Sequence, residues 1–261
     1  MPAEPHDNVS RKKAASPIGR VTFIGLRAAD VVLHHSLIHH GWVSHLIQSL
    51  GGVPVSAPWV VDPASGTLQP YYRLIVLMAF GSSVKQILTM LIISEQETPV
   101  SDAIVISLFN TIVNSLNTLL SLWSLTSCAA MPQATVLNQL LSSPLLAAGT
   151  AAYFLGLVTE LVSELQRTAF KRKAANKGRA YAGGLFSLAR HINYGCYTIW
   201  RASYALTTGG PIWSAVVFYF FFRDFAVRGI PALDKYMTQR YDEQWKRVKE
   251  TVPYKLIPGV Y

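Results

Sequence analysis

Ala103–Leu125 reads AIVISLFNTIVNSLNTLLSLWSL, 23 residues without a charged side chain. A helix of about 20 apolar residues is long enough to cross the hydrocarbon core of a bilayer. The charge-free stretch continues beyond this segment, because the 57 residues from Ala103 to Thr159 contain no Asp, Glu, Lys, Arg or His. The sequence therefore predicts a membrane protein, with Ala103–Leu125 as its clearest membrane span.

The whole chain has the composition of a membrane domain. Of its 261 residues, 51% are hydrophobic and 14% are charged, whereas soluble domains have about 25% charged residues. Its two cysteines stand in apolar surroundings and are expected to be free thiols. No cleavable signal peptide is recognisable, so insertion is expected to depend on internal spans. We expect a disordered polar tail, residues 1–20, followed by a single membrane domain, residues 21–261.

The remaining apolar stretches predict an all-α fold, a multi-pass integral membrane helical bundle with short, broken C-terminal helices and a cytosolic amphipathic tail. The first helix is apolar but carries Arg27, Asp30 and five histidines, so it is either interfacial or a poorly hydrophobic member of the bundle. A Gly209–Gly210–Pro211 break separates two short segments near the end. The expected elements are the helix Val21–Leu50, the connector Gly51–Pro70, the spans Tyr72–Ile93, Ala103–Leu125 and Leu145–Val162, the segments Tyr194–Leu206 and Pro211–Val227, and the helical tail Pro231–Lys249.

Positive charge gathers in one part of the chain. Between Glu164 and Asp224 there are nine basic residues and no acidic one, and this stretch carries the whole net charge of +9. Because cytosolic loops are rich in Lys and Arg, we place the loop Arg167–Arg179 and the tail in the cytosol, with a hairpin of two short segments between them. Such a site attracts an anion, either a phosphorylated cofactor or anionic lipid head groups. No nucleic-acid motif is present, so nucleic acid is not an expected partner.

Three asparagines, Asn110, Asn114 and Asn117, share one face of the clearest span. Amides in a membrane face the protein interior. They are read either as interhelical hydrogen-bonding groups or as the polar wall of a ligand cavity.

Five histidines lie in the first helix, and two of them, four residues apart, share a helical face. They are His34, His35, His39, His40 and His45. Membrane di-iron enzymes use several separate histidine boxes with carboxylates, whereas the only other histidines here are His6 and His191. We expect packed or interfacial histidines and no metal site. Glu95 and Glu97 end the span Tyr72–Ile93 and are read either as a solvated loop or as a source of a proton donor.

The segment Gly184–Tyr194, GLFSLARHINY, holds the densest group of polar side chains before an apolar segment. Arg190, His191, Asn193 and Tyr194 bring a cation, an imidazole, an amide and a phenol into five positions. Because such groups are costly in a membrane unless they bind something, the motif predicts an anion or cofactor site, with helix capping and packing as the alternative.

This motif resembles the C-terminal motif of the steroid reductase and isoprenylcysteine methyltransferase superfamily. Within that superfamily the chain looks most like the domain of unknown function 1295 (DUF1295), the steroid 5α-reductase-like set. Gln166–Lys171 resembles the Gln-Lys-Asn-Ala-Phe-Arg segment of sterol reductases related to the lamin B receptor, and Gly229–Lys235 resembles a Gly-Ile-Pro-Leu-Leu-Glu-Lys run of the DUF1295 set. Tyr241, Trp245 and the ending Val252–Pro258 resemble the reductases' tail. The resemblance covers residues 160–261.

The resemblance implies an NADPH-dependent reductase of a carbon–carbon double bond in a lipophilic, sterol-, terpenoid- or lipid-like substrate, resident in the endoplasmic reticulum. The implied phosphate-binding residues are Arg167, Lys171 and Arg190. The implied residues around ribose and nicotinamide are His191, Asn193 and Tyr194, and further cofactor contacts fall on Arg228, Asp234 and Tyr241. Tyr197 and Glu95 are the candidate catalytic proton donors. Tyr197 stands where the reductases carry an acid, and Arg228 and Asp234 are each about one position out of register.

Two other functions remain open. An S-adenosylmethionine-dependent methyltransferase of the isoprenylcysteine type would share an Arg-His-Pro-x-Tyr motif. Here Ile192 replaces the proline, and Asp224 stands alone where the methyltransferases have a Glu-Glu pair. A non-catalytic lipid-binding or scaffold membrane protein is the third possibility.

Overall fold

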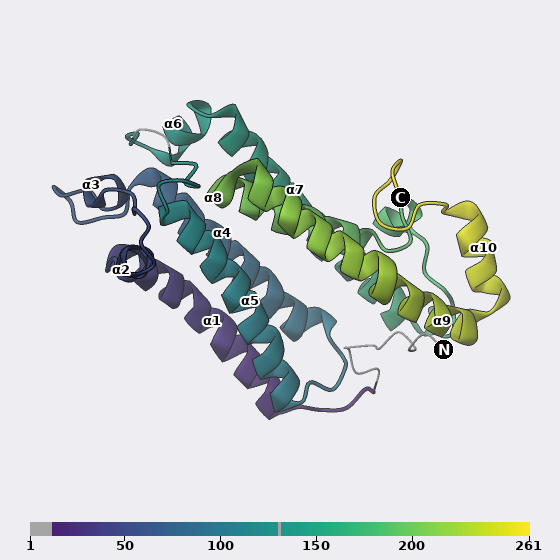
Figure 1. Ribbon diagram of the computed structural model, residues 1–261. Helices are drawn as coiled ribbons and strands as arrows, with labels where there is room; N and C mark the ends of the chain where they lie inside the picture. Colours follow the sequence, from purple (N-terminus) through teal and green to yellow (C-terminus); the bar gives the residue numbers. More distant parts are fainter. Residues whose placement is uncertain (1–11, 130–131) are drawn as a thin grey trace. The chain divides into compact units, whose positions relative to one another are not determined.

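The computed structural model describes residues 12–129 and 132–261, and Figure 1 shows their path. Within these residues the regular elements are helices, without a strand. In chain order they are α1 (Pro17–His39), α2 (Trp42–Ser49), α3 (Ala57–Val60), α4 (Pro70–Leu88), the π-helix η1 (Thr89–Ile93), α5 (Val100–Leu122), α6 (Val136–Leu141), α7 (Pro144–Arg172), the 3₁₀-helices η2 (Ala174–Asn176) and η3 (Gly184–Ser187), α8 (Ile192–Asp224), the π-helix η4 (Phe225–Gly229), α9 (Ile230–Tyr241) and α10 (Glu243–Thr251).

In the described part of the chain, five helical stretches are long and apolar enough to cross a membrane. They are Pro17–His39, Pro70–Ile93, Val100–Leu122, Pro144–Arg172 and Ile192–Tyr241. The predicted multi-pass membrane bundle is therefore confirmed. Residues 17–20 of the predicted disordered tail belong to α1, while residues 1–11 lie outside the described residues.

The chain separates into two compact units. The N-terminal unit contains Lys12–Tyr153 and Ala202–Ala215, and the C-terminal unit contains Phe154–Arg201 and Val216–Tyr261. In the N-terminal unit, α1 packs against α4 and α5 (Figure 1). The polar residues of α5 point inward, since Asn114 is fully buried, whereas Val105 and Ile112 on its other side are exposed. This inside-out pattern is the one expected of a helix that faces lipid.

The predicted helix Val21–Leu50 is two helices, which corrects the sequence reading. The chain turns at Gly41, whose φ of 70° is in the left-handed region that glycine adopts without strain. α1 is the poorly hydrophobic member of the bundle, and α2 is a separate short helix beside its end.

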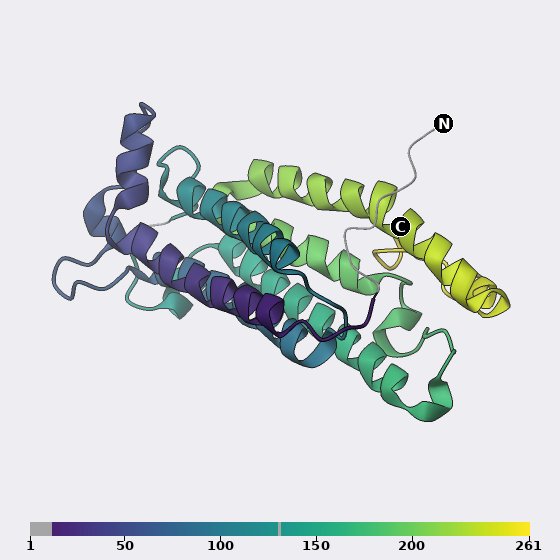
Figure 2. The same ribbon diagram turned by 90° about the horizontal axis from the view of Figure 1, so that it is seen from below.

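The predicted C-terminal hairpin is confirmed. α8 reverses direction at Gly210, with φ 75° and ψ −171°, and Pro211 opens the second arm. The ring centroids of Tyr194 and Phe225 are 4.4 Å apart, and Ser214 Oγ donates to Ala202 O at 2.8 Å, so the two arms run back along each other (Figure 2). The second arm continues through η4 into α9 and is longer than the sequence suggested.

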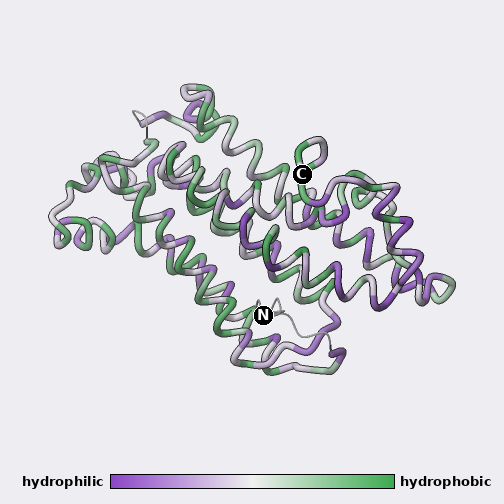
Figure 3. Tube along the Cα trace, turned by 45° about the vertical axis from the view of Figure 1, so that its right-hand side comes forward, coloured by the Kyte–Doolittle hydropathy of each residue, from purple (hydrophilic) through white to green (hydrophobic). Residues whose placement is uncertain are grey.

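Two predicted boundaries of charged segments are wrong. α7 continues to Arg172 instead of ending at Val162, because no Gly or Pro interrupts residues 157–177. The basic loop therefore begins only after Arg172. The predicted tail helix is two helices, α9 and α10, which meet at Asp242 with φ 42° and ψ −115°. In Figure 3 hydrophilic colour gathers along this basic loop and tail.

Candidate functional site

The C-terminal unit brings the end of α7, the Gly184–Tyr194 motif and the chain's tail together. The backbone N–H groups of Arg190 and His191 donate to the carbonyls of Tyr254, at 3.0 Å, and Lys255, at 2.8 Å. The motif is thus fixed at the start of α8 by a short backbone pairing with the segment that follows α10.

Arg190 strengthens this pairing with its side chain. Its Nη1 donates to Val252 O at 2.8 Å, with longer contacts of 3.4 Å to Lys249 O and Pro253 O. These acceptors are neutral backbone carbonyls. Arg190 therefore clamps the tail against the motif.

Asn193 faces a buried carboxylate on α7. Its Nδ2 donates to Glu164 Oε1 at 2.7 Å, and the other oxygen of Glu164 pairs with Arg167. The Arg167 guanidinium also lies 5.2 Å from the centre of the Phe186 ring. Glu164 is buried, so its charge is held in place by an amide and a guanidinium.

A second carboxylate lies one turn earlier on α7. Glu160 is also buried and accepts a hydrogen bond of 2.7 Å from Trp200 Nε1. The neighbouring Arg201 is buried, with its guanidinium 4.4 Å from the Trp200 ring and its Nε 3.1 Å from the Tyr197 hydroxyl. In this arrangement Tyr197, predicted as a proton donor, supports a buried arginine.

His191 combines burial with open hydrogen-bonding capacity. Its side chain is 5% exposed, and its Nε2 has no hydrogen-bond partner among the described residues. The ring lies 6.1 Å from Tyr194 and 6.2 Å from Trp245. Burial lowers the pKa of His191 from 6.5 to about 4, and the nearby Arg190 charge acts in the same direction. The imidazole is therefore neutral at physiological pH.

Of the other predicted site residues, Asp234 lies near His191 through Trp245, and the rest have partners of their own. In the C-terminal unit, Arg228 pairs with Asp224, Asp234 accepts from Trp245 Nε1 at 2.7 Å, Tyr241 is buried beside Arg240, and Lys171 is exposed at the end of α7. Glu95 belongs to the N-terminal unit, where it pairs with Lys13. Their assigned roles stay predictions.

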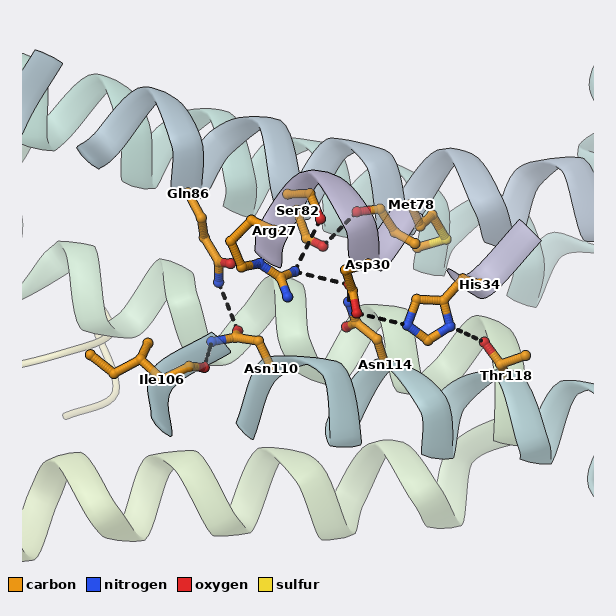
Figure 4. Close-up of polar contacts among 12 residues, drawn as sticks. Arg27, Asp30, His34, Met78, Ser82, Gln86, Ile106, Asn110, Asn114 and Thr118 are labelled. Carbon is orange, nitrogen blue, oxygen red and sulfur yellow. Dashed lines mark hydrogen bonds and ion pairs between the residues drawn. The ribbon is translucent and has the colours of Figure 1, made fainter. Parts of the chain in front are cut away.

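The N-terminal unit holds a second polar cluster, which Figure 4 shows. Arg27 Nη2 lies 3.1 Å from Asp30 Oδ2, and His34 Nε2 lies 3.2 Å from Asp30 Oδ1. Asn114 Nδ2 also donates to Asp30, at 2.8 Å, and His34 Nδ1 lies 3.0 Å from the Thr118 hydroxyl. All five side chains are buried, so α1 is joined to α5 by polar contacts inside the bundle.

The three asparagines of α5 make interhelical hydrogen bonds. Besides the Asn114 contact, Asn110 accepts from Gln86 and Asn117 accepts from Trp213, both at 2.7 Å. The hydrogen-bonding interpretation is thus the one that the structure supports. Among the described residues, no group of three or more His, Cys, Asp or Glu side chains is placed to hold a metal ion.

Comparison with known families places the motif in a wider context. The family described as "Protein of unknown function (DUF1295)" matches residues 101–252, more than half of the chain. The chain belongs to the DUF1295 family. The family match covers the motif, both arms of α8 and the helices of the tail, but not α1 or α4. The resemblance to the wider steroid reductase superfamily is consistent with this membership.

One curated relative has a name that states an activity. The probable O-methyltransferase ustE of Ustilaginoidea virens is 37% identical over 234 residues, which cover 87% of this chain and 81% of the relative. No solved structure matches the chain. The relative's name favours the methyltransferase alternative over the NADPH-dependent reductase.

The site predicted from the sequence did not include the two buried acids of this DUF1295 protein. Glu160 and Glu164 are the first charged residues after the 57-residue charge-free stretch, and they are four positions apart. That spacing puts both on one helical face, here the face toward α8. Two acids on one face at the end of a span were the available signal.

Proposed function

We propose that this protein is a membrane O-methyltransferase that uses S-adenosylmethionine and acts on a hydroxyl group of a lipophilic substrate. The observation that carries the proposal is the 37% identity to a probable O-methyltransferase over 87% of the chain. The membrane-spanning helices support a lipophilic substrate, because such a molecule is concentrated in the bilayer.

Two buried carboxylates support a cationic cofactor, although the C-terminal unit as a whole is basic. S-adenosylmethionine carries a sulfonium and an ammonium group, which buried carboxylates such as Glu160 and Glu164 attract. The phosphates of NADPH would be repelled by the same two acids. Arg190 is occupied by tail carbonyls, whereas Arg167 and Glu164 are partners of each other, so either ligand would have to compete with that pair.

Aromatic and hydrogen-bonding groups beside the acids complete the fit. Glu164 and Asn193 would hold the polar end of the cofactor, and the half-buried Tyr194 ring near His191 would contact adenine. When bound, S-adenosylmethionine supplies the methyl group that passes to the substrate oxygen. His191 Nε2, neutral, buried and without a hydrogen-bond partner among the described residues, would accept the hydrogen bond of the substrate hydroxyl and orient its oxygen, and the proton would be released to water.

Ligand-induced stabilisation of the purified full chain tests the cofactor. We expect S-adenosylmethionine and S-adenosylhomocysteine to raise the melting temperature in detergent, since a ligand at a hundredfold excess over its Kd stabilises by about 2.7 kcal/mol. NADPH should give no shift. A shift with NADPH alone would overturn the proposal in favour of the reductase, and no shift with any of them would favour the non-catalytic reading.

A further inference from the structure

The short helix α2 stands at the point where α1 leaves the membrane. α1 has 23 residues, so it is about 34 Å long and spans a hydrocarbon core of about 30 Å. Its last residue, His39, therefore lies near the membrane surface, and the turn at Gly41 follows directly. Figure 1 looks along α2 while α1 runs across the picture, and Figure 2 shows α2 side-on, at a steep angle to α1. This is the orientation of a helix lying in the plane of the membrane surface.

Two faces of α2 are apolar, whereas a short helix that only packs on protein needs one. Val43 and Ile47 face inward and are buried. On another face Trp42 is 53% exposed, Leu46 49% and Leu50 61%, at a spacing of four residues. Trp59, in the short helix α3, is also exposed. An exposed stripe of this kind needs an apolar partner.

The remaining side of α2 is polar and borders a groove. Ser44, His45 and Gln48 line a groove of about 480 Å³, closed on its other side by the segment from Val53 to Val61. Sites for small organic groups have volumes of roughly 300–1,000 Å³. The polar groups of the groove come mainly from α2, because the segment from Val53 to Val61 is mostly apolar. The apolar stripe and the polar side chains of α2 lie on different sides of the helix and match the two layers of a membrane surface, the acyl chains and the head groups.

We propose that α2 lies in the membrane surface and binds a phospholipid there, with Trp42, Leu46 and Leu50 in the acyl region and the head group against the polar side chains of α2 that line the groove. The continuity of α2 with a membrane-spanning helix argues for a lipid partner, because the stripe begins three residues after α1 ends. Tryptophans are concentrated at this depth of a membrane, where an apolar ring meets a polar boundary. The side chains lining the groove are neutral or weakly basic, which suits a zwitterionic head group.

Fluorescence quenching in phospholipid nanodiscs tests the apolar half of the site. Phosphatidylcholine brominated near the head-group end should quench tryptophan fluorescence more than the same lipid brominated near the terminal methyl. Trp42→Phe, made in a Trp59→Phe background that lacks the other exposed tryptophan of this region, should remove most of this difference, because Trp42 lies at the surface. Trp245→Phe, which removes a buried ring of the C-terminal unit, is the matched control and should leave the difference unchanged. A difference that survives Trp42→Phe would overturn the proposal.

Two further measurements test the groove and the competing occupant. Ser44→Phe fills the groove, and we expect the purified protein to retain less phosphatidylcholine after detergent washing, measured as phosphorus per chain. Retention equal to wild type would show that the head group binds elsewhere. A Leu46→Cys variant should remain monomeric under oxidation in nanodiscs or membranes. Efficient disulfide-linked dimers would show instead that a second copy of the chain covers the stripe, and would overturn the lipid assignment.

Discussion

Asn193 on α8 and Glu164 on α7 are joined by a hydrogen bond of 2.7 Å, although they are 29 residues apart in the chain. The bond ties the motif, which the sequence singles out, to an acid that the sequence does not. Because Glu164 also pairs with Arg167, one carboxylate organises two of the predicted cofactor residues. The charge of this carboxylate should therefore decide which cofactor binds.

Glu164→Gln tests that charge with little change of shape. Glutamine can still accept from Asn193, but it no longer attracts a cation, so we expect S-adenosylmethionine to bind about tenfold to a hundredfold more weakly, from a loss of roughly 1.5–3 kcal/mol. Isothermal titration measures the Kd. Glu243→Gln, which removes an exposed acid of α10, is the control and should bind normally. Unchanged affinity in Glu164→Gln, or a gain of NADPH binding, would contradict the assignment.

His191 should make the protein less stable in acid. Its pKa is about 4 in the folded protein against an ordinary value of 6.5, so below 6.5 the unfolded chain takes up the proton first. Stability from this group falls as the pH drops from 6.5 to 4, by at most about 1.4 kcal/mol per pH unit and on the order of 3 kcal/mol in all. Between pH 6.5 and 4, the melting temperature of His191→Gln should fall less than that of the wild-type protein. Parallel curves for the two proteins would show that His191 is not buried and neutral.

Arg190→Leu should loosen the tail. The change removes the donor to Val252 O and the two longer contacts, which together stabilise the tail by roughly 1–3 kcal/mol. Hydrogen exchange at residues 249–258 should become faster, while exchange in α5 stays the same. Arg247→Leu, at an exposed position of α10, provides the comparison and should leave both regions unchanged. Slow exchange of the tail in Arg190→Leu would mean that backbone pairing alone holds it.

The sequence was informative where one local rule governs the structure. Charge-free runs predicted the spans, and the Gly209–Gly210–Pro211 break predicted the hairpin, because glycine and proline act on the backbone at their own positions. The helix Val21–Leu50 was predicted as one piece because Gly41 is a single glycine with no proline beside it. Only its backbone conformation reveals the turn.

The side-chain partners of the site could not be read in the same way. Arg167 and Arg190 look alike in the sequence, yet one pairs with an acid of its own helix and the other with carbonyls of the tail. Asp30 has partners on its own helix, Arg27 and His34, and on another helix, among them Asn114. Such pairings depend on which helices are neighbours, and hydropathy carries no information on that point.

The basic loop and the tail should face the same side of the membrane. Ala180 N donates to the Gln244 side chain at 3.1 Å, so the loop and α10 are in contact within the C-terminal unit. Basic segments resist translocation, and we expect this side to be the cytosolic side of the endoplasmic reticulum membrane. Cysteines at Lys177 and Glu250, both exposed, should react with an impermeant reagent in sealed microsomes without detergent. Labelling of one of them only after permeabilisation would exclude this topology.

The buried cluster of the N-terminal unit should be sensitive to the loss of one charge and tolerant of the loss of both. Asp30→Asn leaves the Arg27 guanidinium buried without its carboxylate, which costs about 3–5 kcal/mol. Replacing both residues with apolar ones, Arg27→Met with Asp30→Leu, removes the buried charges together and should recover most of that loss. Unfolding in sodium dodecyl sulfate, from a mild detergent, compares the three proteins. The control is Asp102→Asn, at a half-buried acid in the first turn of α5, which should unfold like wild type. A double variant as unstable as Asp30→Asn would show that the contacts of Asp30 with His34 and Asn114, and not its balance with Arg27, hold α1 against α5.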